Sequence, residues 1–413
     1  MERKRVVITG LGVIGSNGIG KDAFYDAVIN GLSGAKPISL FDTSCFKVKS
    51  AGEAGGFCAE SILGPKGLRT LDRSTRLIVS AVKLALDDAS LIINESNSQD
   101  TGIVVGTTLG SVNSICQFDI EALREGPRYV NPALFPNTVI NSPASQASIR
   151  FKITGFNATI STGFSASIDA INYAVDFLRL GRAKYILAGG VEELCKETFV
   201  GFYKAGCLAG LKNNTQEISC PFDKRRNGIL LGEGAAVLVL EELSAALSRG
   251  AQIYAEIVGG GMSFDAYNIC EYDIRGRGLR RAMRLALKDA GLNTEDINYI
   301  CAGANSTQSA DLIETAAIKD VFGEDAKKVY VSSVKSMLGE CFSASGSLQA
   351  AASLAALKRQ MIPPNINYAQ KDAGCDLNYV LNKTVEARVD KVLINSFGPS
   401  GCNSSLIISK FKE

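Results

Sequence analysis

The chain has 413 residues, with 44 Lys and Arg, 42 Asp and Glu, and no histidine. A composition of 46% hydrophobic and 21% charged residues is typical of a folded globular protein and excludes a disordered one. The net charge of +2 gives no general reason to bind nucleic acid or an anionic membrane. The lack of histidine excludes imidazole-dependent proton transfer, nucleophile activation and metal ligation.

Short runs rich in branched aliphatic residues alternate with helical patterns along the chain. The segment Ser165–Leu180 has apolar residues at helical spacing and is followed by Gly181, a typical residue at a helix end. This alternation predicts an α/β fold with largely buried sheets. The runs predicted as strands are Arg5–Thr9, Ile103–Val105, Tyr185–Ala188, Ala235–Leu240 and Val392–Ile394.

The first predicted strand continues into a glycine motif. Gly10, Gly12 and Gly15 match the GxGxxG pattern of dinucleotide-binding sites. In such a site a helix begins at once, whereas here a helical pattern starts only near Lys21, and no strand ending in an acidic residue is evident about twenty residues on. We therefore interpret the motif as a structural turn, and a nicotinamide-dependent enzyme stays a distant alternative.

The cysteines and the N-terminus bear on location and metal content. None of the 11 cysteines forms a CxxC pair, so the sequence favours neither a zinc site nor a redox motif. The start MERKRVVITG lacks signal-peptide features, and no apolar run reaches the ~18 residues that a membrane span needs. We expect reduced thiols, no bound metal and a cytoplasmic protein.

An internal repeat divides the chain. Ala81–Leu91 (AVKLALDDASL) resembles Ala282–Leu292 (AMRLALKDAGL), which lies 201 residues later. A strand-like run that ends in small residues follows each copy, at 101–108 and 297–306. Duplication of one α/β unit predicts two halves, 1–250 and 251–413.

Several segments spread over the whole chain resemble, in order, the β-ketoacyl synthase family of condensing enzymes. The resemblance implies a thiolase-like fold, in which duplicated βαβαβαββ halves form a five-layer αβαβα arrangement. The segments are RVVITGLGVI, LDRSTRL, ISTGFSASIDA (160–170), YILAGGVEE (185–193), PFDKRRNGILLGEGAA (221–236), CAGANSTQSAD (301–311), KSMLGECFSASG (335–346) and NSFGPSGCNSSLII (395–408).

The resemblance also implies that the family's catalytic residues are missing. The nucleophilic cysteine of the family lies at a helix N-terminus in a pattern like STACTS, and Phe164 stands at its position. Gly303 and Glu340 stand where the family has two histidines. Loss of one oxyanion-hole donor alone lowers a rate by about 10²–10³. Loss of the nucleophile and both imidazoles therefore predicts no condensing activity and no catalytic residue.

Other positions of the family pattern are kept or changed singly. Lys335 is kept, a family glutamate is replaced by Gln349, and a gating phenylalanine is replaced by Pro399. Asp223, Lys224 and Glu233 match residues that support active-site loops in the family, so we expect structural roles for them.

Two features near the lost residues keep alternatives open. Cys301 and Cys341 lie beside the missing histidines, where a thiol could act as a displaced nucleophile or simply be a buried apolar side chain. We expect Phe164 to fill the vacated pocket, which would contribute on the order of 1.5–3 kcal/mol.

Within the family, the chain is most similar to the ketosynthase β-subunit, or chain length factor, of a type II polyketide synthase. Such a chain is a non-catalytic subunit of an acyltransferase complex and shapes the tunnel that limits chain elongation. The expected partners are a competent ketosynthase α-subunit, paired through 155–161 in a heterodimer, and an acyl carrier protein. Substrates would arrive on its phosphopantetheine, with no other cofactor.

Two other functions stay open at this stage. One is a malonyl decarboxylase, or another acyl-processing enzyme, with a displaced nucleophile. The other is a purely structural or regulatory homologue. Many chain length factors carry glutamine where Phe164 stands, so a role proposed for that glutamine is not transferred to this chain.

A candidate tunnel wall follows the second predicted strand. Leu109–Leu123 has helical spacing, with Val112, Ile115 and Cys116 near one face. The resemblance implies that this helix reaches the dimer interface and that these side chains, with Pro399, line the tunnel. The alternative is that they are ordinary core residues.

Overall fold

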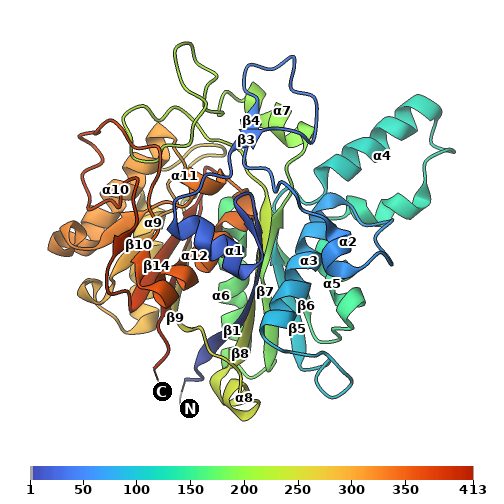
Figure 1. Cartoon of the computed structure of the whole chain (residues 1–413), viewed down its shortest axis with the longest axis horizontal. Helices are drawn as coiled ribbons and strands as arrows, with labels where there is room; N and C mark the ends of the chain where they lie inside the picture. The colour runs from blue at the N-terminus through green and yellow to red at the C-terminus, as the bar shows by residue number, and fades with distance from the viewer. Residues whose placement is uncertain (1–2, 413) are drawn as a thin grey trace.

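A computed structural model describes residues 3–412 and places two sheet halves side by side, with helices against both faces of each (Figure 1). Strands β1 and β9 join the halves through a short antiparallel ladder that pairs Val6–Ile8 with Ala255–Ile257. The N-terminal half has the order β1(Val6–Gly15), β8(Gly234–Glu242), β7(Tyr185–Glu192), β5(Thr101–Gly106) and β6(Asn157–Ile160). The C-terminal half has the order β9(Ala255–Phe264), β15(Cys402–Ser409), β14(Lys391–Phe397), β10(Tyr299–Cys301) and β11(Tyr330–Ser332).

The helices form three layers around the two sheet halves. Helices α6(Ala166–Arg179) and α12(Ser345–Arg359) lie in the middle, because α6 contacts β5, β7 and β15 while α12 contacts β8 and β14. The outer layers are α3(Arg73–Asp88) with α5(Ser142–Phe151) on one side, and α9(Arg277–Ala290) with α10(Gln308–Phe322) on the other. This arrangement confirms the predicted five-layer thiolase-like fold.

The remaining elements lie at the edges of these layers or in the connections. The other helices are α1(Lys21–Ile29), α2(Ala59–Leu63), α4(Val112–Glu125), α7(Lys196–Lys204), α8(Leu243–Ser248) and α11(Lys335–Leu338). The short strands are β2(Gly18–Ile19), β3(Lys36–Pro37), β4(Ser50–Ala51), β12(Met361–Ile362) and β13(Val385–Glu386). The 3₁₀ turns are η1(Pro132–Thr138), η2(Gly163–Ser165), η3(Thr294–Asp296), η4(Gly323–Lys327) and η5(Phe342–Ala344).

The glycine motif that we predicted as a turn lies inside strand β1, so that prediction is wrong. Strand β1 runs unbroken to Gly15, and every residue in it is buried. The glycines serve close packing against α3, since a Cβ on Gly12 would lie 1.8 Å from the backbone oxygen of Ala81. Helix α1 begins at Lys21, as expected, so no helix opens directly after the motif.

The second half repeats this packing. A Cβ on Gly261 of β9 would lie 2.1 Å from the backbone oxygen of Ala282 in α9, and Gly259 meets Ala286 in the same way. Ala282 belongs to the repeated segment that corresponds to Ala81 of α3. The repeat predicted from the sequence is therefore one helix-on-strand unit, built twice with the same small residues at the contact.

The N-terminal half ends in an edge strand and a projecting helix. Within residues 3–412, β6 pairs only with β5, so its outer edge is open. Helix α4 has no buried residue and projects from the body in Figure 1. Large apolar side chains are exposed along α4, η1 and α5, namely Ile115, Ile120, Leu123, Tyr129, Leu134, Phe135, Val139, Ile140 and Ile149.

Candidate functional site

The two central helices begin next to each other, and each is preceded by a 3₁₀ turn that carries a phenylalanine. Phe164 lies in η2 before α6, and Phe342 lies in η5 before α12. Their rings meet edge to face, with centroids 5.2 Å apart. Phe164 thus lies at the helix N-terminus where the resemblance expects the nucleophile, and its side chain cannot form a thioester.

Phe164 forms a wall of a cavity, and our expectation that its ring fills the space of the missing nucleophile stays a prediction. The hydroxyl of Ser396 donates to the backbone oxygen of Phe164 at 2.9 Å, and the ring packs so closely on Gly398 that a Cβ there would lie 2.8 Å from Cγ. In front of the ring a cavity of about 530 Å³ remains. Pro399, Phe202 and Tyr272 also line it.

Glu340, at the position of a family histidine, forms a buried ion pair. Its Oε2 lies 2.8 Å from Nζ of Lys335, and both side chains are almost fully buried. Asn305 also donates to Oε2, while the Ser345 hydroxyl and the backbone N–H of Phe342 donate to Oε1. Every carboxylate oxygen is satisfied, so Glu340 holds a structural position and offers no free base.

Gly303, at the other histidine position, lies beside this ion pair. Its backbone oxygen accepts from Nζ of Lys335 at 3.0 Å, and its N–H donates to Glu314 at 3.0 Å. Burial raises the pKa of Glu314 to about 7. Gln349 donates to the backbone oxygens of Cys301, Ala302 and Asn395 instead of pairing with Lys335.

The two thiols beside the lost histidines are poor nucleophiles. Cys301 and Cys341 are fully buried. Burial raises the pKa of the Cys301 thiol to about 11 and that of the Cys341 thiol well above its usual range. Because the thiolate is the reactive form, neither residue is activated for acyl transfer.

The two carboxylates that match the family pattern, Asp223 and Glu233, bind loop segments, as expected. Glu233 is buried, pairs with Arg73, and accepts from the backbone N–H groups of Ala54 and Leu194. Asp223 accepts from Gln370 N–H at 2.7 Å and from Arg225 Nε at 2.9 Å. Lys224 is exposed.

The structure separates the four residues proposed to line the tunnel. Val112, Ile115 and Cys116 lie on α4, and none of them is buried or lines the cavity at Phe164. Pro399 does line that cavity. The alternative of ordinary core residues is wrong for α4 in this chain, whereas a role in a tunnel stays a prediction.

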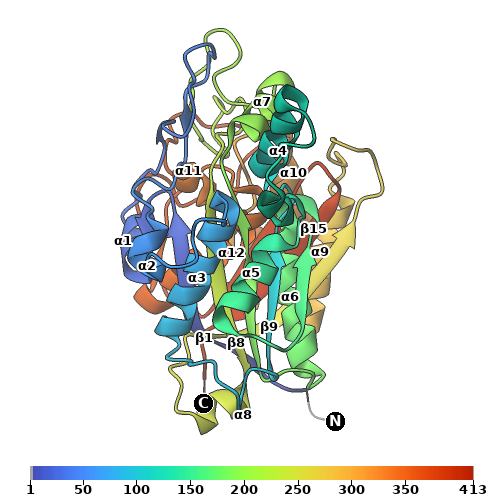
Figure 2. The same ribbon diagram turned by 90° about the vertical axis from the view of Figure 1, so that its right-hand side faces the viewer.

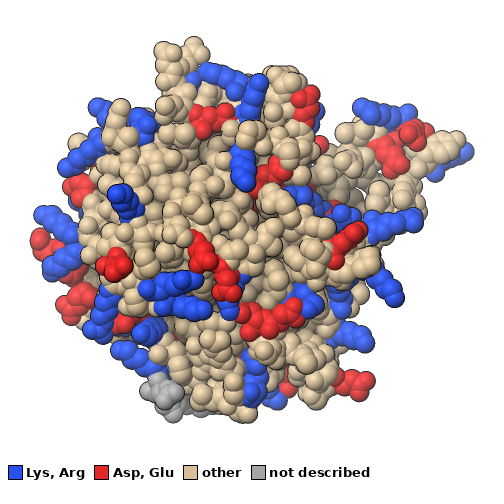
Figure 3. Space-filling view, in the orientation of Figure 1, with Lys and Arg blue, Asp and Glu red and all other residues tan. Residues whose placement is uncertain are grey.

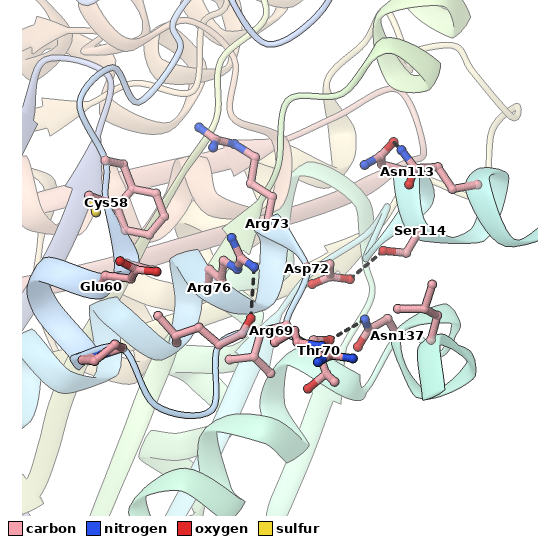
Figure 4. Close-up of a pocket in the computed structure, with 17 residues that line it drawn as sticks. Cys58, Glu60, Arg69, Thr70, Asp72, Arg73, Arg76, Asn113, Ser114 and Asn137 are labelled. Carbon is pink, nitrogen blue, oxygen red and sulfur yellow. Dashed lines mark hydrogen bonds between the residues drawn. The ribbon is translucent and has the colours of Figure 1, made fainter. Parts of the chain in front are cut away.

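A second cavity, of about 600 Å³, lies between the α2–α3 region and α4 (Figure 4). Its charged groups are mixed in sign. Arg73 points to Glu233, Asp72 accepts from Ser114, and Arg76 donates to a backbone oxygen. None of the candidate site residues lines it, although Leu71, Asp72, Arg73 and Arg76 belong to the family segment LDRSTRL, and we assign it no function.

Sequence reasoning missed three residues that complete the site. Tyr272 lines the cavity, and its ring lies 5.8 Å from that of Phe397. Asn305 and Glu314 bind Glu340 and Gly303, respectively. Lys335 and Glu340 are five residues apart in the family segment 335–346, and two opposite charges this close in sequence were the signal for a charge pair. The cavity beside Phe164 therefore has room for a ligand, but among residues 3–412 the site contains no activated nucleophile.

Two features are absent from the part of the chain that the structure describes, a membrane-spanning helix and a metal-binding cluster. None of its helices has the length and apolar character that crossing a bilayer requires. Residues 3–412 hold no cluster of three or more Cys, Asp or Glu side chains able to bind a metal ion.

Comparison with protein families decides the relationship. Residues 3–246 match the family model of the β-ketoacyl synthase N-terminal domain, and residues 254–369 match that of the C-terminal domain. The chain belongs to the β-ketoacyl synthase family. The predicted boundary at residue 250 lies between the two matches, and its position stays a prediction.

Curated ketosynthases resemble this chain over its whole length. It is 38% identical to the 3-oxoacyl-[acyl-carrier-protein] synthase 2 of Coxiella burnetii, over 99% of both chains. It is 37% identical to the enzyme of the same name from Synechocystis, over 100% of this chain and 99% of that one.

Solved ketosynthase structures match as closely. One, described as the ishigamide ketosynthase/chain length factor, has a TM-score of 0.93 at 35% identity, with full coverage of both chains. Another, a type II polyketide synthase acyl-carrier protein in complex with its ketosynthase bound to the hexaketide, has a TM-score of 0.91 at 28% identity, again with full coverage.

Proposed function

We propose that this chain is the non-catalytic β-subunit, or chain length factor, of a ketosynthase complex that builds polyketide chains. The observation that carries the proposal is Phe164 at the N-terminus of α6, in a chain that contains no histidine. Catalysis would come from a competent ketosynthase, and this chain would shape the shared tunnel. Both would work in the cytoplasm.

The chemistry of the site supports a role without catalysis. Gln349 is uncharged, whereas the family has a glutamate at this position. Glu340 supplies a negative charge instead, and it neutralises Lys335. A buried ion pair of this kind leaves neither charge without a counter-charge although the catalytic histidine is missing. The thiols that could act as displaced nucleophiles have raised pKa values.

The exposed apolar face supports a partner subunit. An open edge on β6 and the apolar side chains of α4, η1 and α5 form a surface that is unfavourable in water. A stable partner would cover it with an obligate interface of roughly 2,000–5,000 Å². The structural neighbour described as a ketosynthase/chain length factor supports a heterodimer, and the acyl-carrier complex supports a carrier protein as the substrate donor.

The test is co-expression with the competent ketosynthase encoded nearest to this chain. We expect a soluble 1:1 heterodimer that makes product with malonyl-carrier protein, whereas this chain alone aggregates and makes none. Leu123→Asp on α4 should prevent assembly. Ile92→Asp, which changes an equally exposed apolar residue elsewhere, should leave assembly intact. A well-behaved monomer that ignores the ketosynthase would contradict the proposal.

A further inference from the structure

Exposed cysteines are an unusual feature of this chain. On the face shown in Figure 3, basic and acidic side chains are interspersed, and no patch of one sign is evident there. Free cysteine is among the most buried residue types, because its thiol behaves as a small apolar group. Four of the 11 cysteines are nevertheless exposed, namely Cys45, Cys58, Cys207 and Cys270. Packing in a core does not explain these four.

Two of the exposed thiols line one cavity. Cys207 and Cys270 both belong to the wall of the cavity of about 530 Å³ beside Phe164. Cys207 lies just after α7, and Cys270 lies in the loop that joins β9 to α9. Figure 2 shows α7 and this yellow loop in the upper part of the molecule. Two thiols that are distant in sequence therefore share one space.

The two thiols also influence each other, as neighbours do. Burial raises the pKa of the Cys207 thiol, and the nearby Cys270 adds to the rise. Among residues 3–412, no cluster of three or more Cys, Asp or Glu side chains able to bind a metal ion includes them. A structural zinc site takes four ligands, so two thiols alone suit a disulfide better.

The loop that carries Cys270 is weakly packed. Ala266 and Cys270 have φ angles of +47° and +65°, which residues with a Cβ rarely adopt. Ile269 and Ile274 are 82% and 77% exposed, so the loop buries little apolar surface. Segments of this kind open at a low free-energy cost. A disulfide needs its two Cα atoms within about 7 Å of each other, a requirement that such a loop can meet by a local shift.

We propose that Cys207 and Cys270 form a reversible disulfide across the cavity beside Phe164. The oxidant is a low-molecular-weight disulfide such as oxidised glutathione. The more exposed Cys270 loses its proton and attacks one sulfur of the oxidant, which gives a mixed disulfide and releases one reduced thiol. Cys207 then loses its proton and attacks the Cys270 sulfur, which forms the Cys207–Cys270 bond and releases the second reduced thiol. Two protein thiols are oxidised, one external disulfide is reduced, and both protons end on the released thiols.

The bond would tie the β9–α9 loop to the segment after α7 and so restrict the cavity. In a reducing compartment the pair stays as two thiols, and an oxidising one closes it reversibly. This modification involves only residues of this chain and does not rest on the proposed function.

The test treats the reduced heterodimer with oxidised glutathione and maps its peptides by mass spectrometry without a reducing agent. We expect Cys207 linked to Cys270, a mass of this chain lower by two hydrogen atoms, and full reversal by dithiothreitol. Cys207→Ser should stop the reaction at glutathione on Cys270. Cys45→Ser removes an equally exposed thiol that does not line the cavity and should form the disulfide as the native chain does. Hydrogen exchange in the β9–α9 loop should slow on oxidation in the native chain and not in Cys207→Ser.

Three results would overturn the inference. One is glutathione on both thiols of the native chain with no bond between them, and another is a bond from Cys270 to a different cysteine. The third is zinc that binds to the native chain, is lost in Cys207→Ser and prevents the disulfide. The same mapping on a lysate of cells that express the full chain needs no heterodimer, so failure of the proposed function leaves this test intact.

Discussion

Glu340 and Lys335 form a charge pair that the sequence contained but that sequence reasoning did not recognise. In the sequence, Glu340 was recognised only as the residue that stands where the family has a histidine. In the structure it lies 2.8 Å from Lys335 and accepts three further hydrogen bonds. Both members are buried, so removal of either one would leave the other as a buried group without its ion-pair partner.

Substitution of one member of the pair should therefore lower the free energy of unfolding more than substitution of both. Glu340→Leu leaves Lys335 buried without a counter-charge and should lower the free energy of unfolding by about 3–5 kcal/mol. The double variant Lys335→Met, Glu340→Leu should lower the free energy of unfolding by clearly less than this. Urea unfolding of the purified heterodimer measures both, and equal losses would mean that the pair is not coupled.

The buried carboxyl group of Glu193 should make the stability of the folded protein depend on pH. Burial raises the pKa of Glu193 to about 8, and nearby Asp72 adds to the rise. The unfolded chain loses this proton near the ordinary glutamate pKa of about 4.3, so the folded state binds more protons between that pH and 8. Stability is therefore present at low pH and is lost as the pH rises towards 8.

Glu193→Gln should remove this loss. Native protein should lose up to about 1.4 kcal/mol of stability for each pH unit between roughly 5 and 8 on account of this group, and the variant should not. The measurement is the difference in unfolding midpoint between the two proteins across that range. A difference that does not change with pH would show that Glu193 is ionised in the folded state.

At the scale of elements, glycines set how closely helices approach strands. Gly12 of β1 leaves room for the backbone of α3, where a Cβ would lie 1.8 Å from Ala81 O. Gly201 in α7 has no atom within 4 Å of its Cβ position. The same substitution should thus act in opposite directions at the two sites.

Gly12→Ala should destabilise the protein by several kcal/mol, since backbone atoms must move to accept the methyl group. Gly201→Ala should stabilise it by about 0.5–1 kcal/mol, because alanine favours the helix. Thermal or urea unfolding of the two variants measures both changes in stability relative to the native protein. A neutral Gly12→Ala would show that α3 and β1 are less closely packed than described.

Helix α4 carries the prediction about product length. Val112 is partly exposed on a projecting helix, so a larger side chain there meets no core of its own chain. If α4 lines the shared tunnel, Val112→Phe should stop elongation earlier and shift products of the reconstituted complex to shorter chains, with total turnover roughly kept. Product analysis by mass spectrometry decides this. Loss of yield without a change in length would remove α4 from the tunnel.

At the scale of the whole molecule, the fold could be predicted because it depends on the order of the family segments and on an internal repeat. The family segments and the repeat at Ala81 and Ala282 led to the five-layer fold. The prediction of a turn at Gly10–Gly15 was wrong. A glycine pattern alone does not reveal whether the glycines bend the chain or allow a helix to pack closely on a strand. The position of the Phe164 ring depends on contacts with Phe342 and Gly398, which are distant in sequence, and no local pattern contains that information.

The central claim is that this chain shapes a ketosynthase complex without taking an acyl group itself. Intact-mass analysis of both chains tests it most directly, after the purified heterodimer is incubated with acyl- and malonyl-carrier protein. We predict a stoichiometric acyl adduct on the ketosynthase partner and an unchanged mass for this chain. A stoichiometric adduct on any cysteine of this chain would contradict the account and favour an enzyme with a displaced nucleophile.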